Sequence, residues 1–100
     1  MDGEAMSVYV DDMKARVQMG RKGVWIMSHM IADTRRELDE MAERLELNPK
    51  WKQKVGDRLE HFDVTENYRQ RAIQEGAIPL KVRELVLKLM DRDLKEYLEG

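Results

Sequence analysis

The feature that most limits the fold of this chain is a nearly continuous apolar run over residues 24–31, which only Ser28 and His29 interrupt. A strand that is apolar at almost every position is typical of the middle of a sheet, because helices then cover both of its faces. We therefore predict a central strand here, in an α/β protein.

A helix is predicted directly after this strand. Thr34 and Glu37 have the spacing of a capping box, and an apolar stripe follows at three- and four-residue steps until Asn48-Pro49 ends the helix. The next β-like segment is residues 60–64. Strand 24–31, helix 34–47 and strand 60–64 thus predict a right-handed βαβ crossover with parallel strands.

The remaining segments complete a β-β-α-β-α-β-α order. The expected elements are a strand at 7–10, a loop at 13–23, a basic connection at 50–58, a helix at 66–75, an edge strand at 77–80 and a helix at 82–98. The prediction is a disordered N-terminal tail over residues 1–6 and a small single α/β domain over 7–100. Its short sheet is expected to be mostly parallel and flanked by helices.

Composition removes several classes of function. The 100 residues include no cysteine, which excludes disulfides and thiolate chemistry and favours a reducing compartment such as the cytoplasm. With 18 basic and 20 acidic residues the net charge is −2, so binding of nucleic acid through bulk charge is not expected. No apolar run approaches the roughly 20 residues of a membrane span, and no signal peptide is recognisable.

Polar residues fall where the predicted strands end. Asp11 ends the first strand, Asp33 follows the second and Asp63 lies near the end of the third. The chain has only two histidines, His29 and His61, and each lies on a strand shortly before one of these aspartates. In open parallel sheets ligands bind beyond the carboxyl ends of the strands, so we expect these five residues to form one polar edge. His61 and Asp63 should share a face because they are two residues apart.

An ordered series of blocks resembles the bacterial and prophage family of unknown function DUF4031. The blocks are residues 8–13, 25–34, 37–42, 61–64 and 76–79. Phe62 stands where the family is expected to have Tyr, and Asp12-Met13 stands where many members have Pro-Pro. The resemblance implies a fold and a phage or prophage origin, but no activity.

The first functional hypothesis is a small accessory protein that binds a phosphorylated or nucleotide-like ligand. The polar edge would bind it, helped by amides at the helix N-termini near residues 34 and 65. The Gly20–Gly23 loop would contribute Arg21 and Lys22 as countercharge. A solvated basic loop is the alternative interpretation, since this loop matches no phosphate-binding motif.

The second hypothesis is a divalent-metal hydrolase of the phosphoesterase or nuclease type. His29, Asp33, His61 and Asp63 are the candidate metal ligands, because two imidazoles and one or two carboxylates suit such ions. The competing interpretation is structural: each histidine is hydrogen-bonded to its neighbouring aspartate, and Asp33 and Asp63 cap the helices that follow.

Two further hypotheses concern macromolecular partners. Nucleic-acid contact through Lys50-Trp51-Lys52-Gln53-Lys54 is disfavoured by the net charge, and Trp51 is expected to fold back on helix 34–47 instead. The final helix carries more apolar residues than one sheet face needs, which is typical of a homodimer or of a module that binds or inhibits a host protein. These residues are Val82, Leu85, Val86, Leu89, Met90, Leu94, Tyr97 and Leu98.

Overall fold

A computed structural model describes residues 7–100, and the predicted tail at 1–6 lies outside the described residues. The strands are β1 (Val8–Val10), β2 (Ala15–Gln18), β3 (Val24–Ala32), β4 (Lys52–Gln53), β5 (His61–Thr65) and β6 (Ile78–Pro79). The α-helices are α1 (Arg35–Arg44), α2 (Glu66–Gln74), α3 (Val82–Met90) and α4 (Leu94–Glu99). Two 3-10 turns are η1 (Gly20–Lys22) and η2 (Pro49–Trp51).

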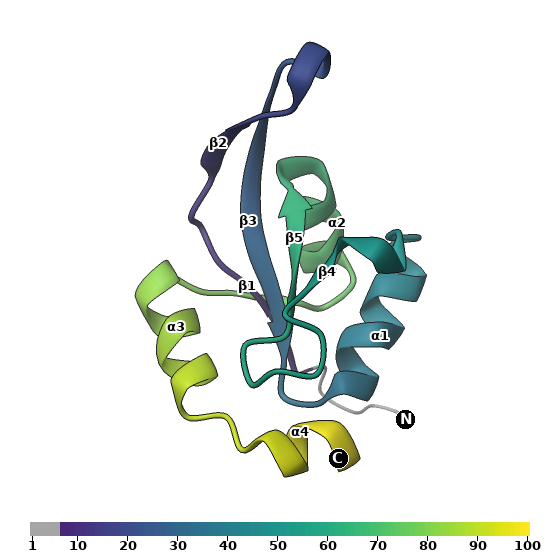
Figure 1. The fold of residues 1–100 in the computed structure, drawn as a ribbon, viewed down its shortest axis with the longest axis vertical. Helices are drawn as coiled ribbons and strands as arrows, with labels where there is room; N and C mark the ends of the chain where they lie inside the picture. Colours follow the sequence, from purple (N-terminus) through teal and green to yellow (C-terminus); the bar gives the residue numbers. More distant parts are fainter. Residues whose placement is uncertain (1–6) are drawn as a thin grey trace.

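The strands form one mixed sheet in the order β4-β5-β3-β1-β6, and β2 pairs with β3 beyond the end of β1 (Figure 1). Every pairing is antiparallel except that of β1 with β6. A compact α/β domain is therefore confirmed, but the prediction of a mostly parallel sheet is wrong.

The error arises in the connection between α1 and β5. Helix α1 runs back along the sheet, as a crossover helix does. The chain then passes along the sheet a second time, through η2, β4 and residues 54–60, before β5 begins (Figure 1). An extended chain covers about 3.3 Å per residue, so a connection of this length spans a strand and reverses the direction of the next one. For this reason β5 lies antiparallel to β3.

The segment predicted as a loop at 13–23 contains β2 and η1, which together with β3 make a long hairpin. Ala15 and Val17 alternate with Arg16 and Gln18, a two-residue period that indicates a strand. The strand has no buried residue, so its alternation is weak in the sequence. The hairpin projects beyond the rest of the sheet (Figure 1).

The helix predicted at 82–98 is two helices. The side chain of Asp93 accepts a hydrogen bond from the backbone N–H of Glu96 and so starts α4 separately from α3. The edge strand predicted at 77–80 is confirmed as β6, and Thr34 caps α1 as expected.

The two faces of the sheet are covered unequally. Helices α1 and α2 bury one face along its length, against Met30 and Ala32 of β3 and Phe62 and Val64 of β5. On the other face, α3 covers only the end of β3 near Ile31, where Leu85 is packed against it. None of the helices within residues 7–100 lies over the upper part of this second face, on β2, β3 and β5 (Figure 1).

A buried ionic network fixes the C-terminal helix to the connection before β5. Glu60 is fully buried and accepts two hydrogen bonds from Arg35, at 3.0 and 2.6 Å. The hydroxyl of Tyr97 and the N–H of Gly56 also donate to the Glu60 carboxylate, and Arg92 donates to the Glu60 carbonyl at 3.0 Å. These donors hold the pKa of Glu60 at about 2, although burial alone would raise it.

Within residues 7–100 no helix combines the length and the apolar character needed to cross a lipid bilayer.

Candidate functional site: a histidine–aspartate cluster on the open sheet face

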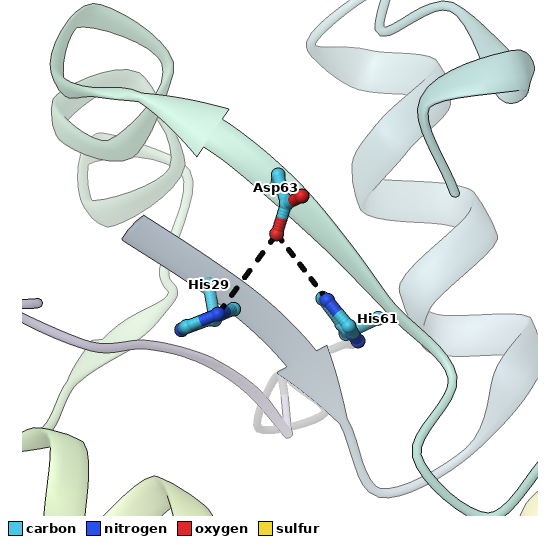
Figure 2. A group of neighbouring side chains, drawn as sticks. All are labelled: His29, His61 and Asp63. Carbon is cyan, nitrogen blue, oxygen red and sulfur yellow. Dashed lines mark ion pairs between the residues drawn. The ribbon is translucent and has the colours of Figure 1, made fainter. Parts of the chain in front are cut away.

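The pairing of β3 with β5 builds the site. His29 lies directly opposite Asp63 in the antiparallel register, and His61 lies two residues before Asp63 on the same face. Figure 2 shows both imidazoles directed toward the Asp63 carboxylate from their two strands. The predicted shared face of His61 and Asp63 is therefore present, and His29 joins them across the strands.

Asp11 lies behind His29 and fixes its ring. The Asp11 side chain is fully buried, and its Oδ2 lies 2.8 Å from Nδ1 of His29. Burial alone would raise the pKa of Asp11, but hydrogen bonds from the His29 ring and from the N–H groups of His29 and Met13 outweigh burial and lower it. Since the ionised carboxylate can only accept, Nδ1 of His29 carries the proton. In the neutral ring, Nε2 is then a free acceptor.

A backbone carbonyl fixes the second imidazole in the same way. Nδ1 of His61 lies 2.7 Å from the carbonyl oxygen of Leu59, which can only accept. Nδ1 of His61 is therefore the donor, and Nε2 of the neutral ring again has a lone pair and no proton. That atom lies 3.2 Å from Oδ1 of Asp63.

Three electron-rich atoms thus converge on one point. Nε2 of His29 lies 3.9 Å from Oδ1 of Asp63, and the rings of His29 and His61 are 5.2 Å apart between centroids. A hydrogen bond donated by the His61 ring, which requires a proton on its Nε2, is the main reason that the pKa of Asp63 lies below its ordinary value, so this carboxylate is ionised. Neutral rings in these tautomers would turn lone pairs toward an anion, an arrangement that needs either an added proton or a cation.

The spacing of the three atoms suits a metal ion. One ligand atom each from His29, His61 and Asp63 lies within 4.8 Å of the others. Ligand atoms about 2.1 Å from a tetrahedral ion are about 3.4 Å from one another, so small side-chain rotations would complete the geometry. Two imidazoles and one carboxylate leave further coordination positions for water or a ligand.

The aspartate predicted at the end of strand 24–31 lies elsewhere. Asp33 directly follows the end of β3 and is four residues from His29, which corresponds to about 13 Å along an extended chain. Its Oδ2 accepts a hydrogen bond from the hydroxyl of Tyr9, on the part of the sheet that α3 covers. Because β3 and β5 are antiparallel, their carboxyl ends point in opposite directions. Asp11, His29, His61 and Asp63 therefore gather on the sheet face and not beyond the strand ends, and Asp33 lies apart from them.

The alternative prediction, in which the aspartates cap helices and each hold a nearby histidine, is also only partly correct. The caps of α1 and α2 are Thr34 and Thr65, so neither Asp33 nor Asp63 is a capping residue. His29 is held by Asp11, which is eighteen residues away in the sequence, and not by the nearby Asp33.

A groove of about 470 Å³ extends from the cluster along the open sheet face. His29 and Asp63 line one end of it, and Lys22 lines it from the hairpin. Arg21, which was expected beside Lys22 at the ligand, is exposed on η1 and does not line the groove. Its other lining residues are Met13, Ala15, Val17, Met19, Trp25, Met27, Ser28, Lys50, Trp51, Gln53 and Thr65.

Most of these groove residues were not predicted from the sequence, and Lys50, Trp51 and Gln53 were considered only for contact with nucleic acid. Trp25, Met27 and His29 occupy alternate positions of β3 and therefore share its open face. The β3 residues on the opposite face are mostly apolar too, so the sequence does not show which residues of the strand lie on the open face. Trp51, expected on α1, instead lies with its ring centroid 6.1 Å from that of Tyr68 on α2, and it also lines the groove.

Arg69 was also missed, and it supports the site from behind. It is buried, and its Nε donates to the carbonyl oxygen of Asp11 at 2.6 Å, while Nη1 lies 3.3 Å from Glu66. Helix α2 thereby fixes the segment that carries the Asp11 carboxylate.

Comparison with known proteins gives a family and no activity. No curated protein and no solved structure matches the chain significantly. A family model described as "Protein of unknown function (DUF4031)" matches residues 8–92, which include every residue of the cluster and of the groove. The chain therefore belongs to the DUF4031 family.

Proposed function

We propose that this protein binds a divalent metal ion through His29, His61 and Asp63, and that the ion binds the anionic group of a phosphorylated ligand in the groove. The proposal combines the two sequence-based hypotheses of ligand binding and of metal binding. It reduces the expected ligand set, because Asp33 lies too far away to take part.

One observation carries the proposal: Nδ1 of each histidine contacts a group that can only accept a hydrogen bond, and both Nε2 atoms face the Asp63 carboxylate. Histidines that bind metals almost always donate their other ring N–H to a carboxylate or a carbonyl. Asp11 and the carbonyl of Leu59 play these two parts here. A pair of buried structural histidines would not need both tautomers set toward one anion.

Hydrolysis is the second candidate function, and the number of ligands favours it. Structural zinc sites are usually closed by four protein ligands, whereas catalytic sites have three protein ligands and keep a position open. The cluster offers three ligands, and side-chain exposures of 31% for His29 and 40% for Asp63 leave it open to the groove. A metal bound there would lower the pKa of a coordinated water and so supply a nucleophile near neutral pH.

Cobalt binding tests the metal centre. Co²⁺ added to the metal-free protein should give visible absorption bands with one equivalent bound, and Zn²⁺ should displace it. His61→Ala and Asp63→Asn should each remove the bands, because two protein ligands hold a divalent ion far more weakly than three.

Asp33→Asn is the matched control, since Asp33 was an equal candidate from the sequence. Asn can still accept the hydrogen bond from Tyr9, so this variant should bind Co²⁺ as the wild type does. Equal binding by the wild type and His61→Ala would contradict the proposal, as would loss of binding in Asp33→Asn alone.

A protein-interaction role stays a prediction. Val86, Met90 and Leu98 of the predicted stripe are exposed, whereas Leu85 and Tyr97 from the same stripe are buried. Homodimer formation, host-protein inhibition and a phage or prophage origin are likewise untested expectations.

A further inference from the structure

The groove beside the cluster has apolar walls on a protein whose surface is otherwise rich in charge. Met13, Val17, Met19 and Trp51 are all more than a third exposed, and all four line the groove. Exposed apolar side chains that gather in one hollow usually mark a binding surface. A bound ligand must therefore offer an apolar part to this surface.

The aromatic side chains of the groove indicate that the apolar part of the ligand is a flat ring. The chain has only two tryptophans, Trp25 and Trp51, and both line the groove. Met27 lies between Trp25 and His29 on the same face of β3. Flat rings bind well to tryptophan faces and to methionine, whose flexible side chain adapts to them.

The charges of the groove favour an anion. Lys22 and Lys50 line it, and Asp63, a proposed metal ligand, is its single carboxylate. With a divalent metal bound, the groove would be positive, because the ion and the two lysines outweigh Asp63 and the buried Asp11 behind His29, although the whole chain carries a net charge of −2. An anionic group would lie at the metal, with the lysines as additional countercharge.

The dimensions match one nucleotide unit. Met27 and Trp25 lie two and four residues from His29, which places them about 7 and 13 Å from it along the strand. A volume of about 470 Å³ is within the usual range for a small-molecule site. Inorganic phosphate would cover the metal but leave the aromatic surface exposed to water.

We infer that the groove binds a nucleoside monophosphate, with its phosphate at the metal and its base against Trp25, Met27 and Trp51. This inference rests on the proposed function, since the metal supplies the phosphate end of the site. The recognised class is a free mononucleotide, because the net negative charge of the chain disfavours a polynucleotide.

Tryptophan fluorescence tests the inference directly, since both fluorophores line the groove. The metal-loaded protein is titrated with AMP, UMP, ribose 5-phosphate and inorganic phosphate, and Co²⁺ absorption records metal binding separately. AMP should quench the fluorescence and bind about tenfold or more tightly than ribose 5-phosphate, as expected for one stacked base. Trp51→Ala should remove most of this difference while leaving the Co²⁺ bands unchanged.

The controls separate the two proposals. Lys22→Ala combined with Lys50→Ala should weaken AMP binding, whereas Lys95→Ala on α4, outside the groove, should not. If metal binds but AMP binds no better than ribose 5-phosphate, the nucleotide inference is overturned and the metal centre stands. If metal does not bind, the proposed function fails. In that case, absence of AMP quenching in the metal-free protein overturns the inference as well.

Discussion

The buried carboxylate of Asp11 lies 2.8 Å from Nδ1 of His29 and holds the ring with Nε2 toward Asp63. The two residues come from neighbouring antiparallel strands, because Asp11 directly follows β1 and His29 lies within β3. This contact raises the pKa of His29 and lowers that of Asp11 against the effect of burial. It orients a half-exposed histidine, as the proposed metal site requires.

Asp11→Asn should weaken metal binding without unfolding the protein. The amide is neutral and can present its NH₂ group to the ring, so the His29 tautomer is no longer fixed. Loss of such an orienting partner typically costs about 10- to 100-fold in metal affinity. Competition titration against a chromophoric chelator measures the change.

Asp12→Asn is the control for this variant. Asp12 is adjacent and exposed, and its Oδ1 accepts a hydrogen bond from Val82, which an amide oxygen can also accept. Its metal affinity should equal that of the wild type. An unchanged affinity in Asp11→Asn would show that the Asp11 contact does not orient a ligand.

Glu60→Gln should lower the free energy of unfolding by about 3 kcal/mol at pH 7, the usual cost of removing one charge from a buried pair. The variant leaves Arg35 without its carboxylate and sets the amide against the Tyr97 hydroxyl. Urea denaturation measures the loss. Glu40→Gln, at an exposed position of α1, should change stability by less than about 0.5 kcal/mol.

Stability should also fall in acid because of Glu60. Its pKa is about 2 in the folded protein against an ordinary value of 4.5, so the unfolded chain takes up the proton first as the pH falls. The contribution, about 3 kcal/mol, is complete above pH 4.5 and is lost progressively between pH 4.5 and 2. Urea midpoints of the wild type and Glu60→Gln should therefore converge over this interval. A constant difference between them would contradict the assignment.

Asp93→Ala should destabilise the protein by about 1 kcal/mol, because it removes the side-chain cap of α4. Thermal unfolding measures the loss, and Asp91→Ala, at the end of α3, is the comparison. If residues 82–98 formed one continuous helix, as the apolar stripe predicts, alanine at position 93 would instead stabilise it.

The sequence predicts the local elements of this fold well and their directions poorly. Thr34 and Glu37 mark the start of α1 because capping depends on neighbouring residues. Strand direction depends on where a connection ends in space, and residues 50–60 contain no local signal that they cross the sheet again. The break between α3 and α4 was not predicted, because the apolar stripe of the sequence continues across it.

The candidate site was predicted in part for the same reason. His61 and Asp63 can be paired from their spacing, since alternate residues of a strand share a face. The pairing of Asp11 with His29, and of His29 with Asp63, follows from strand register, which no short motif specifies. Asp33 was included only because parallel strands would have brought their carboxyl ends together.

The metal site can be located in a crystal structure of the protein grown with Zn²⁺, with data collected at the zinc absorption edge. We expect one strong anomalous peak within about 2.2 Å of Nε2 of His29, Nε2 of His61 and a carboxylate oxygen of Asp63. Asp11 and the Leu59 carbonyl should still accept the Nδ1 protons. An anomalous map without a peak at this position, from crystals in which both rings keep these contacts, would show that His29, His61 and Asp63 do not form a metal site.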